Sequence, residues 1–346
     1  MDKKAEMGEI TAENKENGVQ NVLVTGGAGF IGSNTLCFLL PRYPNIRFVC
    51  LDKLNPCSSI KNLDEIKDCP NLLLVKGDIT SSDFVDHLIV SQRIDTILHF
   101  AGQSHVDNSF GNSFEFTIAN VFGTHVLLES ARIRKSQIKL FIHASTDEVY
   151  GESTDGLDPK NPYSATKLAA EFLAKSYRHS FGLPLIITRS CNVYGPRQHP
   201  EKIIPKFINL LMRGHPCPLH GNGQNRRSFL YITDVALAFE VVLFKGVIGE
   251  VYNIGSCFEI ANIDTLRRVL KLFNLQDRET DYITFVEDRA FNDFRYQVKP
   301  LGLESLGWKP LVEFDDGLKM TKEWYEKNTN YWPNIKSALK AHPVLL

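Results

Sequence analysis

The sequence predicts an α/β fold, a doubly wound parallel sheet followed by a smaller C-terminal α/β region. Short apolar, strand-like segments alternate with helical ones from residue 21 to residue 190, which is typical of parallel strands joined by right-handed helical crossovers. A glycine-rich turn joins the first strand-like segment to the first helical one. Beyond Arg189 the character changes, because turns and arginine-bearing loops become frequent.

The elements are expected in a regular order. Strands are expected at residues 21–25, 47–51, 72–75, 96–100, 140–143 and 185–188, and helices at 33–40, 82–90, 119–133 and 163–180. Farther along we expect helices at 205–212, 235–244 and 318–327, strands at 229–232 and 251–254, and a turn at 192–196. We therefore divide the chain into a disordered tail (1–20), a sheet domain (21–190) and a second domain (191–346). Segments of one of these two domains can contribute to the other.

Composition narrows the classes of function. The chain has 346 residues, 43% hydrophobic and 23% charged, with a net charge of -1, so nothing indicates a nucleic acid or an anionic membrane as partner. No apolar run reaches the roughly 18 residues of a transmembrane helix, and residues 1–20 lack the apolar core of a secretory signal. The seven cysteines include no C-x-x-C pair, which favours a reducing compartment such as the cytoplasm and predicts neither disulfides nor a metal site.

The glycine-rich turn places Gly26, Gly29 and Gly32 in the spacing G-x-x-G-x-x-G. Without a Cβ, these residues permit a tight turn and let backbone N–H groups at a helix N-terminus approach a pyrophosphate. Phe30 and Ile31 begin that helix and are expected to share the contact. The spacing is a variant of the dinucleotide-binding fingerprint and predicts a Rossmann-type sheet.

Asp52 is the expected partner of the cofactor ribose, because it ends the second strand 20 residues past Gly32. A carboxylate there accepts from the ribose hydroxyls and repels a 2′-phosphate, so NAD is favoured over NADP. The neighbouring Lys53 weakens this preference, since a lysine can also contact a phosphate. Asp78, followed by Ile79, is expected near the adenine or, alternatively, as the N-cap of a surface helix.

Hydroxyl and acidic side chains follow the strand at 140–143. Ser145, Thr146, Asp147 and Glu148 come where this strand leaves the sheet, the edge at which ligands bind in open α/β folds. Two adjacent carboxyl groups push their pKa values apart, so that one can serve as acid and the other as base. The alternative is an ordinary solvated turn.

Tyr163 and Lys167 are four residues apart in the helix expected at 163–180, so both side chains lie on one helical face. A lysine ammonium favours the phenolate and lowers a pKa that is ordinarily about 10, which makes the tyrosine a candidate base. Such a pair is also common in helices that have no catalytic role. Its place in a chain with a nucleotide-binding turn favours the catalytic interpretation.

Further side chains are candidates for substrate contacts. His105 follows the strand at 96–100, and we expect it either to hydrogen-bond a substrate hydroxyl or to cap its loop. Arg226, Arg227 and Arg289 lie in expected loops, where guanidinium groups suit a doubly charged pyrophosphate. The alternative is a salt-bridge cluster on the surface.

These motifs resemble those of the extended short-chain dehydrogenase/reductases, and within them the nucleotide-sugar 4,6-dehydratases, over roughly residues 21 to 330. The glycine turn, Tyr163-x-x-x-Lys167 and Asn192-Val193-Tyr194-Gly195-Pro196 mark the superfamily. The sharper likeness is the Asp147-Glu148 pair, because related 4-epimerases carry small hydroxylated residues there and UDP-glucuronate decarboxylases usually keep only the glutamate. Residues 103–107, 200–202, 227–231 and 288–296 are similar to substrate-binding segments, with Phe229 where many bacterial members have tryptophan.

The resemblance implies a mechanism in which tightly bound NAD is regenerated at each turnover. Tyr163, assisted by Lys167 and Thr146, would take the proton of the glucose 4-hydroxyl while the C4 hydride goes to NAD. Glu148 would then take the C5 proton, Asp147 would give a proton to the departing 6-hydroxyl, and the hydride would return to C6. The substrate would be dTDP-glucose or UDP-glucose, in cytoplasmic deoxysugar biosynthesis such as that of rhamnose.

The resemblance also assigns residues and partners. Implied cofactor contacts are Gly26, Gly29, Phe30, Ile31, Gly32, Asp52, Lys53, Asp78, Ile79, Ala101, Asn120, Ser145, Tyr163 and Lys167. Implied substrate contacts are His105, Asn192, Glu201, Lys202, Arg227, Asn262, Arg289 and Tyr296. A homodimer is expected through helices at 121–134 and 163–180. The alternatives are a UDP-sugar 4-epimerase or decarboxylase and, in a different class, a non-catalytic protein that binds NAD or a nucleotide sugar.

Overall fold

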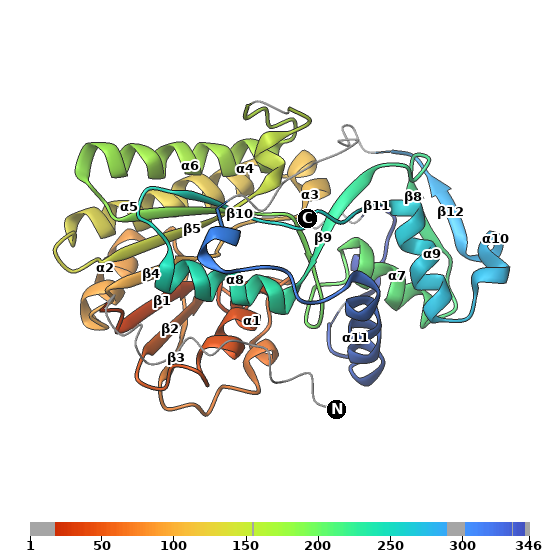
Figure 1. Cartoon of the computed structure of the whole chain (residues 1–346), viewed down its shortest axis with the longest axis horizontal. Coiled ribbons are helices and arrows are strands. Elements are labelled where there is room, and N and C mark those ends of the chain that lie inside the picture. The colour runs from red at the N-terminus through yellow and green to blue at the C-terminus, as the bar shows by residue number, and fades with distance from the viewer. Residues whose placement is uncertain (1–17, 154–155, 289–301, 334, 343–346) are drawn as a thin grey trace.

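The main sheet of the protein has seven strands, all parallel, in the order β10-β6-β5-β4-β1-β2-β3. The structure, a computed structural model, describes residues 18–153, 156–288, 302–333 and 335–342 (Figure 1). The strands are β1 (Asn21–Thr25), β2 (Arg47–Asp52), β3 (Leu72–Lys76), β4 (Thr96–His99), β5 (Leu140–Thr146), β6 (Leu185–Ser190) and β10 (Val251–Ile254). This order confirms the doubly wound sheet expected from the sequence.

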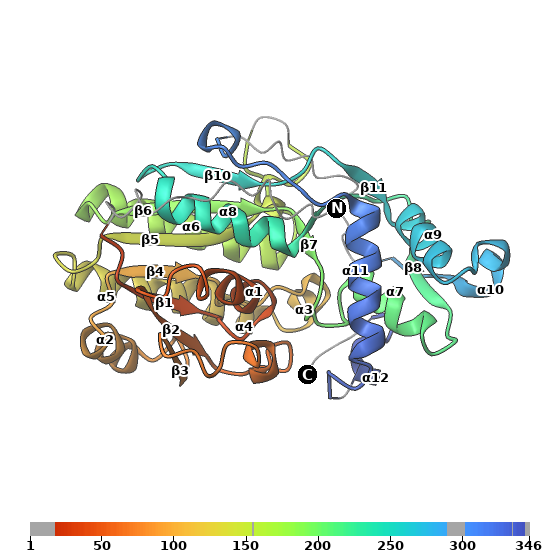
Figure 2. The same cartoon turned by 60° about the horizontal axis from the view of Figure 1, so that its bottom comes forward.

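Helices cover both faces of this sheet (Figures 1 and 2). One face carries α1 (Phe30–Leu39) and α8 (Ile232–Lys245), and the other carries α2 (Ser82–Ser91), α5 (Gly123–Ile133) and α6 (Pro162–Phe181). Side chains alternate along each strand, so Val22 and Val24 of β1 join the hydrophobic cluster under α1 and α8, and Leu23 joins the opposite one. Because both faces are buried, the strands are apolar throughout rather than alternating.

The remaining elements form what we call the smaller lobe, together with short connecting helices. Its strands are β7 (Asn192–Tyr194), β9 (Arg226–Tyr231) and β11 (Glu259–Ala261) in one sheet, and β8 (Cys217–His220) with β12 (Ile283–Val286) in another. Its helices are α7 (Ile203–Leu211), α9 (Asn262–Leu272), η6 (Gln276–Arg278), α10 (Glu279–Tyr282), η7 (Glu304–Leu306), α11 (Phe314–Lys327) and α12 (Ile335–Ala338). Short helices elsewhere are η3 (Ile60–Leu63), α3 (Val106–Gly111), α4 (Ser113–Phe116), η4 (Thr117–Phe122) and η5 (Asp147–Tyr150).

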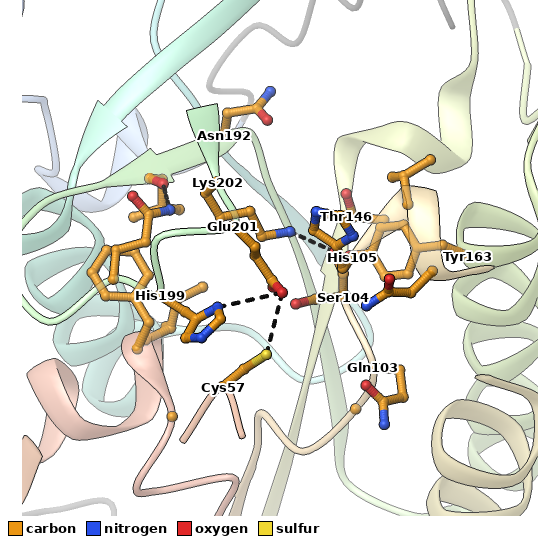
Figure 3. Close-up of a pocket in the computed structure, with 18 of the residues that line it drawn as sticks. Cys57, Gln103, Ser104, His105, Thr146, Tyr163, Asn192, His199, Glu201 and Lys202 are labelled. Atoms are coloured by element: carbon orange, nitrogen blue, oxygen red, sulfur yellow. Dashed lines mark hydrogen bonds and ion pairs between the residues drawn. The ribbon is translucent and has the colours of Figure 1, made fainter. Parts of the chain in front are cut away.

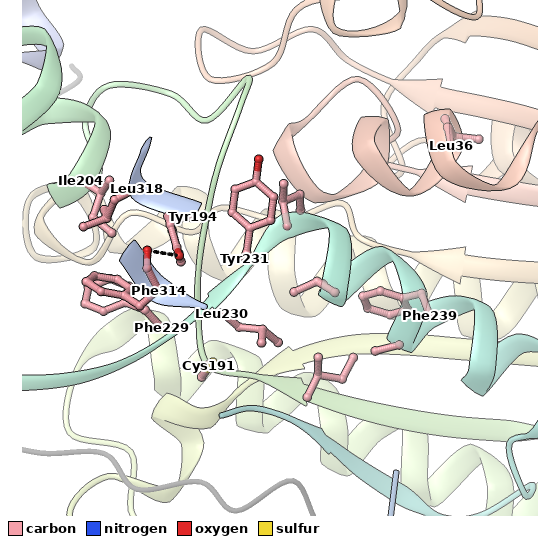
Figure 4. Close-up of a cluster of buried hydrophobic side chains, with 14 of the residues drawn as sticks. Leu36, Cys191, Tyr194, Ile204, Phe229, Leu230, Tyr231, Phe239, Phe314 and Leu318 are labelled. Atoms are coloured by element: carbon pink, nitrogen blue, oxygen red, sulfur yellow. Dashed lines mark hydrogen bonds between the residues drawn. The ribbon is translucent and has the colours of Figure 1, made fainter. Parts of the chain in front are cut away.

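One hydrophobic cluster joins the main sheet to the smaller lobe. It runs from Leu36 on α1 and Phe239 on α8 to Tyr194, Phe229 and Phe314 (Figure 4). The Tyr194 hydroxyl donates to the Phe314 carbonyl over 3.0 Å, so its one polar atom is satisfied inside the cluster. The two parts of the chain are therefore packed around a shared core.

The chain crosses between the two parts, since α8 and β10 come after residue 190 yet pack on and extend the main sheet. The sequence placed Arg226 and Arg227 in a loop, but the structure places both in β9, paired with β11. Residues 192–194, expected to be a turn, form β7 beside β9. Both errors have one cause: these short strands are held by partners distant in sequence, which local patterns do not show.

The described part of the chain begins at Gly18, three residues before the first expected strand. Residues 1–17 of the predicted tail lie outside the described residues. The backbone N–H of Gln20, however, donates to Asp95 Oδ2 over 3.0 Å, so the fold begins before Asn21. Within the part of the chain that the structure describes, no helix has both the length and the apolar character needed to cross a membrane.

Candidate active site

A cavity of about 720 Å³ opens at the carboxyl ends of the main-sheet strands and extends against the smaller lobe. Its walls come from loops after β1, β2, β3, β4 and β5, from the start of α6, and from residues around β7, α7, β8 and β9. Figure 3 shows part of it, with Thr146 and Tyr163 on one side and Asn192, Glu201 and Lys202 on the other. This is the position at which open α/β sheets bind ligands.

The glycine turn forms one end of the cavity, which is lined by Gly26, Gly29, Phe30, Ile31 and Gly32. Gly26 has a φ of 68°, and a Cβ there would lie 2.7 Å from the backbone nitrogen of Ala101. A Cβ on Gly32 would lie 2.4 Å from the Gly26 carbonyl oxygen. Only glycine fits at both positions, so the turn brings backbone close to the cavity at the N-terminus of α1.

Asp52 lines the cavity and also holds the glycine turn in place. Its Oδ2 atom accepts from the Ala28 backbone N–H over 3.0 Å, and its Oδ1 atom accepts from the Leu54 N–H over 2.7 Å and from the Ser58 hydroxyl over 3.0 Å. These bonds fix the carboxylate at the end of β2, where a ribose is expected.

Lys53 and Asp78 form an ion pair, with 3.4 Å between Lys53 Nζ and Asp78 Oδ2. The lysine charge is thus already partnered by a carboxylate. Asp78 accepts from the Thr80 backbone N–H over 3.0 Å and lines the cavity with Ile79, whereas the N-cap of α2 is Ser81. The structure therefore favours the cavity position of Asp78 over the helix-cap alternative.

Asn120, expected to contact the cofactor, does not line the cavity in the described part of the chain. Its Oδ1 atom accepts from the Gln103 N–H over 2.7 Å, and its Nδ2 atom donates to the Gln103 carbonyl over 3.1 Å and to Thr166 Oγ1 over 3.0 Å. The π-helical turn of η4 directs the buried amide at the loop after β4, and the cofactor contact of Asn120 stays a prediction. Asn120 ties that loop, including the cavity residue Ala101, to α6.

His105 lines the cavity from the first position before α3. Its side chain makes no capping hydrogen bond to that helix. The imidazole therefore lies at the cavity wall, and its contact with a substrate hydroxyl stays a prediction. Its charge contributes to the environment of Glu201 across the cavity.

The acidic pair comes directly after β5. Thr146 caps the short helix η5, since its Oγ1 atom accepts from the Glu148 N–H over 3.3 Å. Asp147 is 2% exposed, and its Oδ1 atom accepts from the Thr146 hydroxyl over 3.3 Å. Glu148 Oε2 accepts from Asn161 Nδ2 over 3.0 Å. Both carboxyl groups line the cavity, so the pair is not an ordinary solvated turn.

Tyr163 lies in the first turn of α6 because that helix has a well-defined start. Asn161 and Ser164 form a capping box, and Pro162 occupies the first helical position. Lys167 follows one turn later, and its Nζ atom donates to the Ala144 carbonyl over 2.6 Å at the end of β5. Both side chains line the cavity, as the spacing predicted.

Burial sets the ionisation of these groups. Burial, and then the Glu148 carboxylate, raises the pKa of Asp147 to about 8, so Asp147 carries a proton at neutral pH. Burial lowers the pKa of Lys167 to about 8, against the opposing effect of Glu171. Burial and the Glu148 charge raise the pKa of Tyr163, and a hydrogen bond with Thr146 opposes them.

The pKa of Tyr163 is raised, whereas the sequence predicted that Lys167 would lower it. Among the described residues, Lys167 is not one of the groups that shift the Tyr163 pKa. The reason is that the ammonium is directed at the Ala144 carbonyl, while the phenol lies near two carboxyl groups. The acid and base expected at positions 147 and 148 agree with the raised pKa of Asp147.

The smaller lobe supplies the other wall. Asn192 on β7, Arg227 on β9, Asn262 at the start of α9, and the segment Glu201-Lys202 before α7 all line the cavity. Lys202 Nζ donates to the Ser104 carbonyl over 2.6 Å. The predicted substrate contacts Arg289 and Tyr296 lie outside the described residues.

Several buried polar atoms of this cavity have no hydrogen-bond partner in the described part of the chain. Among them are Ser145 Oγ, Asp147 Oδ2 and Asn262 Oδ1. Buried polar atoms are nearly always paired, so these three mark where a polar ligand would complete the network. They lie at the acid pair and at the smaller lobe, which indicates a ligand that reaches both.

Sequence reasoning missed three residues of the site. Asn161 could have been found, because an asparagine before Pro162 at a helix start is a capping signal that places it beside the acid pair. Cys57 and His199 surround Glu201, yet Cys57 and Glu201 are separated by 144 residues. No local pattern links them.

Comparison with known proteins agrees with this geometry. The family model for GDP-mannose 4,6 dehydratase matches residues 23–321. A trifunctional UDP-glucose 4,6-dehydratase/UDP-4-keto-6-deoxy-D-glucose 3,5-epimerase/UDP-4-keto-L-rhamnose-reductase of Arabidopsis thaliana is 52% identical over 337 residues, covering 94% of this chain and 50% of that protein. The chain thus spans about half the length of this relative.

This chain matches two further proteins over nearly their whole length. A Homo sapiens dTDP-D-glucose 4,6-dehydratase is 45% identical over 335 residues, covering 94% of this chain and 95% of that protein. The dTDP-glucose 4,6-dehydratase of Streptomyces venezuelae, solved with NAD and TYD bound, has a TM-score of 0.86 and 36% identity, covering 91% of this chain and 100% of that one. The chain therefore belongs to the GDP-mannose 4,6 dehydratase family.

Proposed function

We propose that this protein is an NAD-dependent nucleotide-sugar 4,6-dehydratase, a hydro-lyase that converts dTDP-glucose or UDP-glucose into the 4-keto-6-deoxyglucose derivative and water. The observation that carries the proposal is the buried Asp147, whose pKa is raised by burial and by the adjacent Glu148, in the same cavity as Tyr163. The relatives named as dTDP-glucose and UDP-glucose 4,6-dehydratases support the same reaction. A 4-epimerase would have no use for Asp147, because epimerisation includes no elimination.

The residues present fit NAD. The glycine turn leaves room for backbone contact with a pyrophosphate, and Asp52 is fixed where a ribose hydroxyl would bind. Ser145 Oγ has no hydrogen-bond partner among the residues that the structure describes. Asp78, Ile79 and the Ala101 loop complete that end of the cavity. When bound, NAD⁺ would accept the hydride from C4 and give it back at C6, and its positive charge would favour the phenolate form of Tyr163.

Tyr163 is proposed to take the proton of the sugar 4-hydroxyl. Thr146 hydrogen-bonds the phenol and lowers its pKa, which stabilises the phenolate as the proton moves. Lys167 is held one helical turn away by the Ala144 carbonyl, so its position is fixed relative to the phenol. Loss of the 4-hydroxyl proton and formation of the 4-keto group make the neighbouring C5–H acidic.

Elimination of water needs one base and one acid, and the acid pair supplies both. Glu148, oriented by Asn161, is proposed to take the C5 proton. Asp147, protonated at neutral pH, gives its proton to the 6-hydroxyl as the C6–O bond breaks. Glu148 then returns a proton to C5. Groups of this kind typically contribute about 10² to 10⁴ in rate each.

The smaller lobe is proposed to bind the nucleotide diphosphate, and the main sheet to bind NAD and carry the catalytic residues. Lys202 and Arg227 bring positive charge, and Asn192 and Asn262 bring amide groups, to one wall of the cavity. Arg289 and Tyr296 are proposed to join them. On this division, residues 21–190 serve mainly the chemistry and residues 191–346 mainly recognise the donor.

A homodimer is proposed through α5 and α6. Large apolar side chains are exposed on α5, on α6 and on the neighbouring α4 and η4: they are Phe114, Ile118, Phe122, Ile133 and Phe172, of which Phe114 is 82% exposed. Exposed apolar side chains gathered on neighbouring elements are typical of subunit interfaces. We also propose a cytoplasmic location, since all seven cysteines are free, and a product that feeds deoxysugar synthesis such as that of rhamnose.

The test is to incubate the purified protein with dTDP-glucose and UDP-glucose separately and to follow the 4-keto-6-deoxy product by NMR. We expect one donor or both to be converted without net consumption of NAD. A product of galactose configuration, or NAD consumed in proportion to sugar, would contradict dehydration.

A further inference from the structure

Three side chains of the types that bind metal ions lie close together in the cavity wall opposite Tyr163. Cys57 comes from the loop after β2, and His199 and Glu201 come from the segment before α7 (Figure 3). All three line the cavity. The proposed dehydration gives no role to Cys57 or His199.

The distances in this cluster fit a metal ion. Cys57 Sγ lies 3.3 Å, and His199 Nδ1 3.4 Å, from the same atom, Glu201 Oε2. The three ligand atoms all lie within 4.8 Å of one another. A tetrahedral zinc ion with bonds of about 2.0 Å to N and O and about 2.3 Å to S separates its ligands by roughly 3.3 to 3.5 Å. Only small movements would bring all three atoms onto one ion.

A second observation concerns the orientation of the imidazole. His199 is 8% exposed, and its Nδ1 atom is directed at the buried Glu201 carboxylate over 3.4 Å, with no other polar partner among the described residues. The His199 ring packs edge to face against Trp332, with 4.9 Å between the ring centroids. A fixed, buried imidazole nitrogen that shares a carboxylate oxygen with a thiol has the orientation that a metal ligand needs.

The segments that carry the three ligands are anchored by neighbouring side chains. Lys202 Nζ donates to the Ser104 carbonyl, and the ion pair recorded for Glu201 among the described residues is with His199. The loop that carries Cys57 is anchored independently, since Ser58 donates to Asp52 over 3.0 Å. The three ligands thus sit on supported backbone from both parts of the chain.

We propose that Cys57, His199 and Glu201 form a binding site for a thiophilic divalent cation such as Zn²⁺. Thiolate, imidazole and carboxylate are ligands that zinc takes readily, and three protein ligands leave a fourth position open toward the cavity. Binding releases the thiol proton to solvent. The bound ion connects the loop after β2 with the segment before α7.

One consequence rests on the proposed function. Glu201 and Lys202 belong to the wall proposed to bind the nucleotide sugar, so an ion held by Glu201 occupies part of the space and uses a group that the sugar needs. Zinc is therefore an inhibitor that competes with the nucleotide sugar.

Direct binding tests the site without any substrate. The full chain is reduced with a phosphine, stripped with a chelator and titrated with Co²⁺, whose thiolate complexes absorb in the near ultraviolet and whose tetrahedral complexes absorb strongly in the visible. We expect one equivalent to produce both bands and Zn²⁺ to abolish them. No charge-transfer band in the wild type overturns the proposal.

Matched variants locate the ion. Cys57→Ala should lose the charge-transfer band, and His199→Phe, which keeps a ring against Trp332, should weaken Co²⁺ binding at least tenfold. Cys257→Ala removes an exposed thiol and should bind as the wild type does. Circular dichroism and the melting temperature check that each variant is folded. A band that persists in Cys57→Ala but is lost in Cys257→Ala assigns the metal elsewhere and overturns the site.

Turnover tests the consequence separately. Added Zn²⁺ should raise the apparent KM for the nucleotide sugar in the wild type with kcat unchanged, and a chelator should restore it. The ratio of KM with and without Zn²⁺ should fall to near one in Cys57→Ala. Cobalt bands without this competition would refute the inhibition and leave the metal site standing, whereas absence of any turnover would count against the proposed function alone.

Discussion

Asn161 connects the start of α6 to the proposed C5 base, because its Nδ2 atom donates to Glu148 Oε2 over 3.0 Å while its Oδ1 atom accepts from the Ser164 N–H over 2.8 Å. One side chain thus caps the helix that carries Tyr163 and orients the carboxylate that faces it. The phenol and the base are positioned relative to each other by a single amide.

This double role can be separated by substitution. Asn161→Ala should lose both functions: about 1 kcal/mol of stability from the helix cap, and a roughly tenfold lower kcat because Glu148 is no longer oriented. Asn161→Ser keeps a capping hydroxyl but cannot reach Glu148, so it should melt near the wild-type temperature and show the same loss of kcat. Equal kcat in Asn161→Ser and the wild type would mean that the bond to Glu148 has no catalytic effect.

Asp147→Asn should spare oxidation more than water loss. The amide keeps the shape of the side chain but cannot donate the acidic proton, so elimination should slow by about 10² to 10⁴. Rapid quenching and mass spectrometry should then show the 4-keto sugar that still carries its 6-hydroxyl. If that species is absent and oxidation is slowed equally, Asp147 is not the acid.

The same residue predicts a pH dependence of stability. The pKa of Asp147 rises from 3.8 in the unfolded chain to about 8 in the fold, so the folded protein holds an extra proton between these values. The stabilising contribution is full below pH 3.8 and is lost as pH rises through about 8. Melting temperatures of Asp147→Asn should therefore fall less over this pH window than those of the wild type. Parallel curves would contradict the raised pKa.

Glu148→Gln should block proton exchange at C5. The amide cannot accept a proton, so deuterium from D₂O should not enter C5 of the sugar, although the 4-hydroxyl can still be oxidised. Mass spectrometry of quenched reactions measures the incorporation, with the wild type as the positive control. Rapid C5 exchange in the variant would refute the assignment of Glu148 as base.

Gly26→Ala should abolish retention of NAD. A side chain at φ 68° is strained, and its Cβ would lie 2.7 Å from the Ala101 nitrogen, so the turn must move. Gly307→Ala is the matched control, because its φ of 88° imposes similar strain of about 1–2 kcal/mol with nothing within 4 Å of the new Cβ. NAD content, measured by absorbance after denaturation, should fall only in Gly26→Ala.

Phe122→Glu should dissociate the proposed dimer. Phe122 is 49% exposed at the end of η4, directly before α5, and a buried carboxylate at an interface is costly. Light scattering after gel filtration should give a monomer mass. Val247→Glu changes an exposed apolar residue after α8 and should leave the mass unchanged. A monomeric wild type would contradict the interface outright.

The parts predicted well from the sequence are those encoded locally. The glycine turn, the Asp147-Glu148 pair and the spacing of Tyr163 and Lys167 are each specified within a few residues and follow a clear strand or precede a clear helix. Their positions in the cavity depend only on parallel strands sharing one edge. The fold class was predictable for the same reason.

What the sequence did not show depends on contacts between distant segments. The resemblance implied a cofactor contact for Asn120, and that contact stays a prediction, but nothing local showed that its buried amide bonds to Gln103. Arg226 and Arg227 became strand residues only through pairing with β11. The pKa of Tyr163 reflects burial and the acids opposite it rather than its helical neighbour Lys167, and burial cannot be read from spacing.

The proposed reaction is tested most directly by following a deuterium label placed at C4 of dTDP-glucose and of UDP-glucose. Because the buried acid pair and Tyr163 share one cavity, we predict that the label moves to C6 within the same molecule, that one solvent proton enters C5, and that the 6-oxygen is lost as water. A label that returns to C4, with the 6-hydroxyl retained, would contradict the proposed reaction.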